Sequence, residues 1–276
     1  NFNIDIAAIE KAITPKTKAI IPVHLFGLAA NMDEVMALAE KHNLYVIEDN
    51  AQGIGATYTS KTGQKKMTGG IGHVGSTSFF PSKNLGCYGD GGAIFTNDDD
   101  LAHVIRGIVN HGMYKRYHHD VVGVNSRLDS IQAAVLRAKL PKLDQYNTTR
   151  RNTARKYTMA FAGIQNIITP TGFCDSESSI CDTCDCHVFH QYTLQIKNID
   201  RDALVAHLNA NDIPCGVYYP IPLHLQKAYA DSRYKEADFT VTNTLVKEVV
   251  SLPMHTELDD EQIAFITKTL IDFVTK

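Results

Sequence analysis

One short run of apolar residues constrains the fold of this 276-residue chain more than any other feature. Residues Leu44–Glu48 read L-Y-V-I-E, a pattern typical of a strand buried inside a parallel sheet. Residues 17–43 before it predict a strand, a turn and a helix that begins at a capping box of Asn31 and Glu34. The chain is therefore expected to form a βα unit of a doubly wound α/β sheet.

An acidic residue follows this strand directly. Asp49 is placed where open α/β sheets bind their ligands, just beyond the carboxyl end of a strand. The segment E-D-N-A-Q at 48–52 then adds Gln52 and small residues. Asp49 and Gln52 are thus candidates for a ligand site.

A second segment, Ser76–Gly92, places one lysine in a turn. It reads S-T-S-F-F-P-S-K-N-L-G-C-Y-G-D-G-G, so that a short apolar strand ends and Lys83 follows between Ser82 and Asn84. The glycines after it let backbone pass close to a bound group. A surface lysine in a glycine-rich loop would give the same pattern, and only the acidic strand end upstream favours a functional role.

A carboxylate and a lysine that face one crevice meet the needs of pyridoxal phosphate. Lysine forms a Schiff base with the cofactor aldehyde, while an aspartate keeps the pyridine nitrogen protonated so that the ring can accept electrons. Asp49 follows one predicted strand and Lys83 a later one, so the two side chains could face one crevice. We therefore expect a pyridoxal phosphate site.

Five segments extend this pattern along nearly the whole chain. They are T-K-A-I-I-P-V-H-L-F-G at 17–27, E-D-N-A-Q at 48–52, G-H-V-G-S-T-S-F-F-P-S-K-N-L-G at 72–86, N-S-R-L-D at 125–129 and Y-Y-P-I-P-L-H-L-Q at 218–226. In this order they resemble the sugar aminotransferases of the DegT/DnrJ/EryC1/StrS group. The resemblance implies the type I fold of pyridoxal-phosphate transferases, like aspartate aminotransferase: a mostly parallel sheet flanked by helices and a smaller C-terminal α+β domain.

The resemblance also implies roles for particular side chains. Lys83 would form the Schiff base and shuttle a proton as catalytic base and acid, and Asp49 would face the pyridine nitrogen. Gln52 would contact the cofactor ring or its hydroxyl, and Ser78 would hold the phosphate. Asn125 would reach the phosphate of the neighbouring subunit's cofactor, which implies a homodimer with shared active sites.

The segment at 218–226 is the candidate substrate contact. Pro220 and Pro222 stiffen it and hold Tyr219 and His224 in fixed positions. A packed connector would show the same features. The resemblance makes the segment a wall of the substrate site, with Tyr219 and His224 in contact with a sugar nucleotide.

The implied activity is transfer of an amino group, from L-glutamate, to the keto group of a nucleotide-linked deoxysugar in surface polysaccharide or glycoside biosynthesis. One alternative is a pyridoxal-phosphate sugar dehydratase, in which histidine replaces the lysine; here Lys83 is intact. The other is a non-catalytic regulatory or interaction protein that keeps the fold. No helix-turn-helix with a basic recognition face is visible to support it.

Composition and charge indicate which kinds of partner and which cellular location to expect for this chain. The net charge of −3 comes from interspersed charges, so neither nucleic acid nor an anionic membrane is an expected partner. No apolar run reaches transmembrane length and no secretory leader is visible, which favours the cytoplasm. We expect a large cofactor-binding domain at 1–145 and a small C-terminal domain at 146–276. Because the chain opens at Asn1 without methionine, the family pattern also suggests that an N-terminal portion, about one domain's worth, is absent.

Two segments and one histidine leave several interpretations open. The run H-G-M-Y-K-R-Y-H-H at 111–119 suits a substrate-covering loop, a subunit contact or, least well, a metal cluster. Cys181 and Cys184 have zinc-ligand spacing, but they and two more of the six cysteines crowd into 174–186, with no second separated pair to close a fold around a metal. We therefore expect reduced thiols in a surface loop and no bound metal. For His24, a structural hydrogen bond competes with a chemical role.

Further elements follow from periodicity and capping signals. Within the segment Asp129–Leu140, the residues Ile131, Val135 and Leu136 are expected to face inward. The expected strands are Ala93–Thr96, 187–196 and Cys215–Tyr219, and the expected helices are Asp99–Val109, Asp129–Leu140, one capped near Asp200, Phe239–Val249 and Asp260–Val274.

Overall fold

The computed structural model describes residues 1–170 and 185–276. The described chain packs as two compact units. The first comprises residues 1–148 and 185–190, and the second residues 149–170 and 191–276. The domain boundary between residues 145 and 146 stays a prediction. None of the helices in the described ranges is long and apolar enough to cross a membrane.

A four-stranded sheet organises the first unit. Its strand order is β1 (Ala19–Ile20), β2 (Tyr45–Asp49), β5 (Val74–Ser78) and β6 (Gly92–Phe95). The first three strands are parallel, and β6 runs antiparallel to β5. The predicted α/β fold with a mostly parallel sheet is confirmed, and Asp49 pairs with Ser76 across β2 and β5. The carboxyl ends of these two strands therefore lie side by side.

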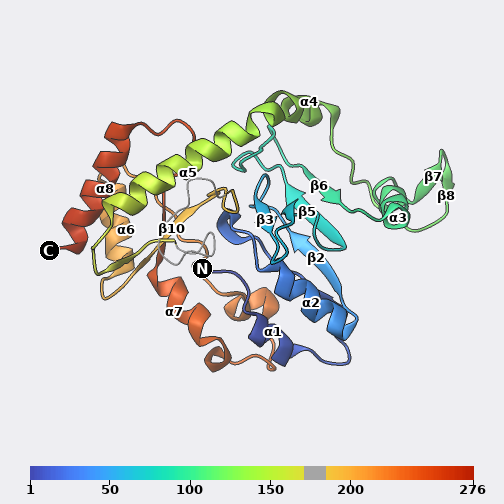
Figure 1. Cartoon of the computed structure of the whole chain (residues 1–276), viewed down its shortest axis with the longest axis horizontal. Helices are drawn as coiled ribbons and strands as arrows, with labels where there is room; N and C mark the ends of the chain where they lie inside the picture. The colour runs from blue at the N-terminus through green and yellow to red at the C-terminus, as the bar shows by residue number, and fades with distance from the viewer. Residues whose placement is uncertain (171–184) are drawn as a thin grey trace. The chain divides into compact units, whose positions relative to one another are not determined.

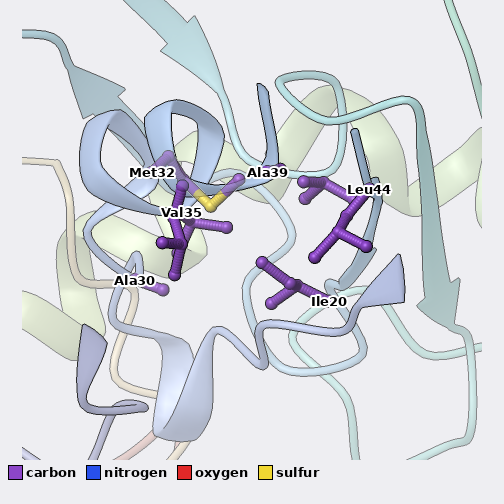
Figure 2. Packing of buried hydrophobic residues seen from close by; sticks show 8 residues of the cluster. Ile20, Ala30, Met32, Val35, Ala39 and Leu44 are labelled. Atoms are coloured by element: carbon purple, nitrogen blue, oxygen red, sulfur yellow. The ribbon is translucent and has the colours of Figure 1, made fainter. Parts of the chain in front are cut away.

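Two helices cover this sheet. Helix α2 (Met32–His42) packs against β1 and β2, and α1 (Ile6–Ala12) packs against α2 (Figure 1). The core between them is made of aliphatic side chains, as Figure 2 shows. Its buried members are Ile20, Ala30, Met32, Val35, Leu38, Ala39, Leu44 and Val46. This core fixes the strand that carries Asp49.

The predicted capping box of α2 is wrong. Asn31 makes no side-chain hydrogen bond to the helix start. Instead the Tyr58 hydroxyl accepts the Asp33 N–H at 3.1 Å and donates to Asn31 Oδ1 at 3.0 Å. A tyrosine from β3 thus satisfies the exposed helix N–H in place of a local side chain.

The remaining elements of the first unit follow the sheet. They are η1 (Leu25–Gly27), β3 (Thr57–Thr59), β4 (Lys65–Met67), α3 (Asp99–Val109), β7 (Met113–Lys115), β8 (His118–His119), α4 (Ser130–Lys139), η2 (Leu140–Lys142) and the start of α5 (Leu143–Ala160). The polar run at 111–119 forms the hairpin β7–β8 beside α3 (Figure 1). Asp98 caps α3 as expected, through a 2.9 Å bond from the Leu101 N–H. Of the three residues of α4 predicted to face inward, Leu136 is buried and Val135 is half-buried beside it, whereas Ile131 is 75% exposed and the prediction for it is wrong.

The second unit is α+β. Its antiparallel sheet has the order β11 (Val249–Leu252), β10 (Tyr192–Ile196) and β9 (Ile167–Ile168). With the rest of α5 it contains α6 (Arg201–Ala210), η3 (Leu223–Leu225), η4 (Lys227–Tyr229), η5 (Glu236–Phe239), α7 (Thr240–Glu248) and α8 (Asp260–Val274). The strand predicted at Cys215–Tyr219 is wrong. Only Gly216 pairs, with Ser251, since Pro214 and Pro220 on either side have no N–H for a ladder.

Candidate active site

Asp49 ends β2 with one carboxylate oxygen unused. Its backbone is fixed on both sides, because the Asp49 N–H donates to Pro22 O at 2.9 Å and Asp49 O accepts from the His24 N–H at 3.0 Å. Oδ1 accepts the Ala51 N–H at 3.0 Å. The second oxygen accepts no hydrogen bond from the described residues, and the side chain is half-buried. The carboxylate is therefore held firmly and can still bind a cationic group.

Lys83 lies in a tight turn that follows β5. The Lys83 N–H donates to Phe80 O at 2.9 Å, and the Cys87 N–H donates to Phe79 O at 2.8 Å, which closes the turn. Gly86 is required there: a Cβ at this position would lie 2.4 Å from the Pro81 carbonyl oxygen. The sequence prediction of a turn that presents this lysine is consistent with this backbone.

The Lys83 amine has no ion-pair partner among the residues that the structure describes, and the side chain is half-buried. Burial lowers the pKa of Lys83, and the negative charge of Asp49 opposes this shift. The two side chains are thus close enough to interact electrostatically. An amine of lowered pKa is more readily neutral, which is what a proton acceptor needs.

Ser78 and Gln52 lie near the carboxyl ends of β5 and β2. Ser78 is the last residue of β5, and Gln52 follows β2 by three residues. Ser78 ends β5, and its Oγ accepts the Phe80 N–H at 3.2 Å. Gln52 is buried, and its Oε1 accepts the Phe26 N–H at 2.6 Å. Phe26 has φ +57°, an uncommon conformation for an aromatic residue, and the hydrogen bond from its N–H to Gln52 stabilises this backbone. The cofactor contact expected of Gln52 stays a prediction.

The other three predicted site residues lie elsewhere in the chain. Asn125 is exposed and pairs with Asn110 in an isolated bridge of the first unit. Tyr219 and His224 belong to the second unit. Tyr219 is 55% exposed, and the His224 ring stacks on Phe239 with a centroid distance of 4.3 Å. The roles assigned to these side chains stay predictions.

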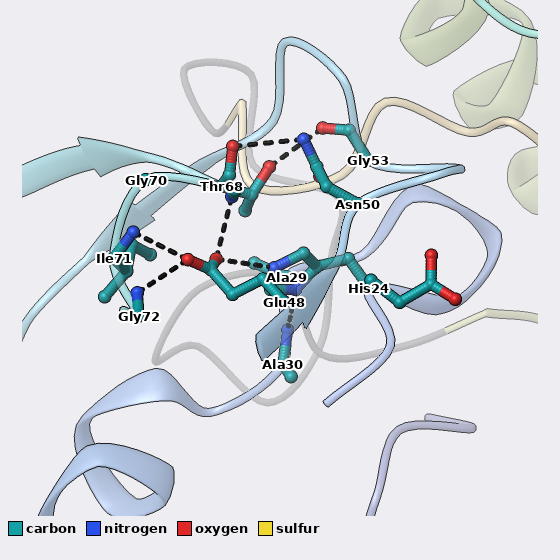
Figure 3. Close-up of polar contacts among 12 residues, drawn as sticks. His24, Ala29, Ala30, Glu48, Asn50, Gly53, Thr68, Gly70, Ile71 and Gly72 are labelled. Carbon is teal, nitrogen blue, oxygen red and sulfur yellow. Dashed lines mark hydrogen bonds and ion pairs between the residues drawn. The ribbon is translucent and has the colours of Figure 1, made fainter. Parts of the chain in front are cut away.

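A buried carboxylate that no sequence motif singled out lies next to Asp49. Glu48 is completely buried, and Figure 3 shows its carboxylate surrounded by hydrogen-bond donors. Oε1 accepts the N–H groups of Ile71 and Gly72, each at 2.6 Å. Oε2 accepts the Gly69 N–H at 2.7 Å and contacts His24 Nε2 at 2.8 Å. Glu48 thereby ties β2 to the loop that leads into β5.

His24 has the structural role that the sequence left open. Its Nδ1 accepts the Ala30 N–H at 3.1 Å, so the ring hydrogen is on Nε2 and is donated to Glu48. Burial alone would raise the pKa of Glu48, but the hydrogen bonds from His24, Gly72 and Gly69 outweigh it and hold that pKa below its ordinary value of 4.5. Glu48 therefore stays ionised at neutral pH.

The cysteine segment lies mostly outside the residues that the structure describes. Cys174, Cys181 and Cys184 lie outside the described residues, so the choice between thiols and zinc stays a prediction. Nearby His187 is buried, which lowers its pKa to about 3, and its Nδ1 accepts the Phe189 N–H at 3.0 Å. Residues 1–170 and 185–276 contain no group of three or more metal-ligating side chains gathered about one point.

Comparison with known proteins identifies the family. The model of the DegT/DnrJ/EryC1/StrS aminotransferase family matches residues 1–271, and the chain belongs to this family. A protein from Geobacillus stearothermophilus named pleiotropic regulatory protein is 45% identical, over 99% of this chain and 69% of its own length. The UDP-N-acetyl-3-dehydro-alpha-D-glucosamine 3-aminotransferase of Acidithiobacillus ferrooxidans is 46% identical, over 98% and 68%.

Solved structures agree with this assignment. The crystal structure of DesV from S. venezuelae in complex with a ketimine intermediate is 37% identical, with a TM-score of 0.89 over 99% of this chain and 70% of that chain. NtdA from Bacillus subtilis, solved with bound cofactor PMP, is 28% identical, with a TM-score of 0.85 over 100% and 60%. The type I fold expected from the sequence motifs is confirmed.

The hydrogen bonds of Glu48 predict a pH-dependent effect of one substitution. Glu48→Gln keeps the shape of the side chain but turns an amide NH₂ toward N–H donors, so we expect a loss of about 2–4 kcal/mol in the free energy of unfolding at pH 7. The folded-state pKa of Glu48 is depressed, so its stabilisation is complete above pH 4.5 and is lost as the pH falls through the folded value. The difference from wild type should therefore shrink in acid.

Urea unfolding at pH 7 and at low pH measures this difference. Glu40→Gln is the control, because Glu40 is exposed on α2 and its substitution should change stability by about 0.5 kcal/mol or less. Equal effects of the two substitutions, or an effect of Glu48→Gln that does not change with pH, would contradict the role given to Glu48.

Proposed function

We propose that this chain is a pyridoxal-phosphate-dependent aminotransferase that transfers an amino group to the keto group of a nucleotide-linked deoxysugar. The observation that carries the proposal is the pairing of β2 with β5. It brings a carboxylate with an unused oxygen, Asp49, close to a half-buried amine without an ion-pair partner among the described residues, Lys83. Family membership supplies the class of reaction.

The residues present fit the cofactor. Pyridoxal phosphate supplies, when bound, an aldehyde for covalent attachment and a ring that accepts electrons from a carbon that loses a proton. Lys83 would hold it through Nζ, and the spare oxygen of Asp49 would keep a proton on the pyridine nitrogen. Ser78 would donate its hydroxyl to the phosphate, and Gln52 would contact the ring or its hydroxyl. All four residues belong to the first unit.

Lys83 also moves the proton that the reaction requires. Once substrate amine has replaced it, the Nζ of Lys83 accepts a proton from the substrate carbon and returns it to the cofactor carbon, as general base and then general acid. A lysine does this only when neutral, and burial of Lys83 lowers its pKa in that direction. Asp49 would hold the proton on the ring nitrogen of the bound cofactor.

The substrates are proposed from the names of relatives. The relative from Acidithiobacillus ferrooxidans is named for a UDP-linked keto-sugar, and one from Bacillus subtilis for spore coat polysaccharide biosynthesis. For this chain we propose a nucleotide-linked keto-sugar as acceptor, L-glutamate as donor, and a place in surface polysaccharide or glycoside biosynthesis. Tyr219 and His224 are the proposed sugar-nucleotide contacts. A cytoplasmic location stays a prediction.

A regulatory function is the second candidate, because one relative at 45% identity is named a pleiotropic regulatory protein. A sugar dehydratase is the third. The intact Lys83 favours the aminotransferase over the dehydratase, in which histidine replaces the lysine.

Amino transfer is tested directly with a labelled donor. The full-length protein, supplied with pyridoxal phosphate, ¹⁵N-glutamate and a panel of UDP- and dTDP-linked keto-sugars, should place ¹⁵N in one sugar product detected by mass. Lys83→Ala should abolish this product. Loss of water from the sugar without ¹⁵N would indicate a dehydratase, and conversion of no sugar in the panel by a protein that binds the cofactor would favour the regulatory alternative.

Covalent attachment is a separate prediction. Borohydride reduction of the cofactor-loaded protein should fix a pyridoxyl group on Lys83, because this amine is half-buried, of lowered pKa and close to Asp49. Peptide mass spectrometry locates the label. The exposed lysines Lys61, Lys65 and Lys66 serve as internal controls, and label on any of them in place of Lys83 would refute the assignment.

We also propose a homodimer whose subunits share their active sites through Asn125. Asn125 is exposed and its side chain makes no hydrogen bond within the described residues, which suits a contact to a partner. Mixing Lys83→Ala chains with Asn125→Asp chains, each inactive alone, should then restore up to about a quarter of the native sites, since random pairing makes half the dimers mixed and each has one intact site. No recovery after verified subunit exchange would contradict a shared site.

A further inference from the structure

Asn84 directly follows Lys83, and every polar atom of its side chain makes a hydrogen bond. It is only 8% exposed. Its Nδ2 donates to Asn147 Oδ1 at 2.8 Å and to Val188 O at 2.9 Å, while its Oδ1 accepts from His190 Nδ1 at 3.3 Å. An asparagine amide has two N–H donors, and both are used here. The sequence marked Asn84 only as part of a turn.

Asn147 extends these contacts to the backbone beyond Gln52. It lies on α5, is 1% exposed, and donates its Nδ2 to Ile54 O at 3.2 Å. The next residue, Gly55, has φ +83°, and a Cβ there would lie 2.4 Å from Asn147 Nδ2. The Asn84–Asn147 pair therefore joins the lysine turn to the turn that follows Gln52.

The segment 188–190 adds a third turn. The Val188 N–H donates to Gly27 O at 2.9 Å, and a Cβ at Gly27 would lie 2.9 Å from Val188 Cγ2. Gly27 follows Phe26, whose N–H is bonded to Gln52. The turns that carry Lys83 and Gln52 and the turn at Gly27 are thus all packed around Asn84, Asn147 and Val188, within the first unit.

Two hydrogen-bond partners of Asn84 lie where the chain passes from the first unit to the second. Asn147 precedes Thr148, the residue at which the first unit gives way to the second along α5, and His190 is the last residue before the second unit resumes at Gln191. Asn84 therefore hydrogen-bonds both described segments of the first unit that continue into the second. The lysine turn is anchored to the two connecting segments and not only to its own sheet.

We propose that Asn84 is a positioning residue for Lys83: its amide clamps the lysine turn to the two segments that connect the units and so fixes the direction and solvation of the Lys83 amine near Asp49. Adjacent Cα atoms are about 3.8 Å apart, so anchoring Asn84 leaves Lys83 little freedom beyond its own side-chain rotations. The proposal rests on the proposed role of Lys83. It assigns Asn84 no contact with cofactor or substrate.

The test measures how the reactivity of the Lys83 amine depends on pH in the cofactor-free protein. Reductive methylation of the cofactor-free protein across a pH series, read by peptide mass spectrometry, gives the pH at which each lysine becomes reactive. Asn84→Leu removes all three hydrogen bonds without adding a charge. The loosened turn should admit water, raise the pKa of Lys83 and lower its reactivity at pH 8 by about threefold or more, which corresponds to about half a pKa unit.

Two further variants distinguish a specific effect on Lys83 from a general loss of structure. Asn97→Leu, at an exposed asparagine with one hydrogen bond to Gly70 O, should leave the Lys83 profile unchanged. Asn147→Leu leaves Asn84 bonded to Val188 and His190. This variant should raise the pKa of Lys83 by a smaller amount than Asn84→Leu does. If Asn84→Leu fails to fold, the result for Asn147→Leu decides whether the proposal holds. In the loaded protein Asn84→Leu should lower kcat for amino transfer and leave the KM of the sugar unchanged.

An unchanged Lys83 profile in the folded variant would overturn the proposal, whatever happens to kcat. This outcome is distinguishable from failure of the proposed function. If Lys83 is not the residue that binds the cofactor, borohydride labelling of the wild-type protein fails, while the methylation profile of Lys83 still reports on the turn.

Discussion

The parallel pairing of β2 with β5 is the constraint on which the candidate site depends. Its register sets Asp49 opposite Ser76, so the residues that follow each strand emerge at the same edge of the sheet. Asp49 and Gln52 come from one strand end, and Ser78 and Lys83 from the other. A shift of β2 by one residue would turn Asp49 toward the opposite face of the sheet and separate it from Lys83.

Each of the two proposed catalytic residues has a buried polar neighbour along the chain that is held by hydrogen bonds. Glu48 precedes Asp49 and receives hydrogen bonds from Gly69, Ile71, Gly72 and His24. Asn84 follows Lys83 and uses all its polar atoms. Asp49 and Lys83 themselves keep an unused oxygen and an amine without an ion-pair partner among the described residues. The anchoring and the reactivity are thus divided between adjacent residues, which lets the reactive groups stay incompletely bonded at a fixed place.

The sequence could predict the parts of this arrangement that are local. An apolar strand ending in Asp49 and a glycine-rich turn after Lys83 are patterns of a few residues, and the motifs gave the family. The anchors could not be predicted, because the donors to Glu48 come from a loop more than twenty residues away and the partners of Asn84 lie on α5 and beside the cysteine segment. The capping of α2 could not be predicted for the same reason. The Asp33 N–H at the helix start bonds to Tyr58 from β3, and not to a side chain of the predicted capping box. The exposure of Ile131 and the lack of strand pairing beyond Gly216 in Cys215–Tyr219 likewise depend on neighbours that a periodic pattern does not reveal.

The central claim is that β2 delivers Asp49 to a pyridine nitrogen held opposite Lys83. The most direct measurement is the ¹⁵N chemical shift of pyridoxal phosphate labelled at the ring nitrogen and bound to the protein. We expect a protonated nitrogen in the wild type from pH 7 to pH 8, and an unprotonated one in Asp49→Asn, whose amide carries no charge to hold the proton. An unprotonated nitrogen in the wild type, or a protonated one that persists in Asp49→Asn, would contradict the account.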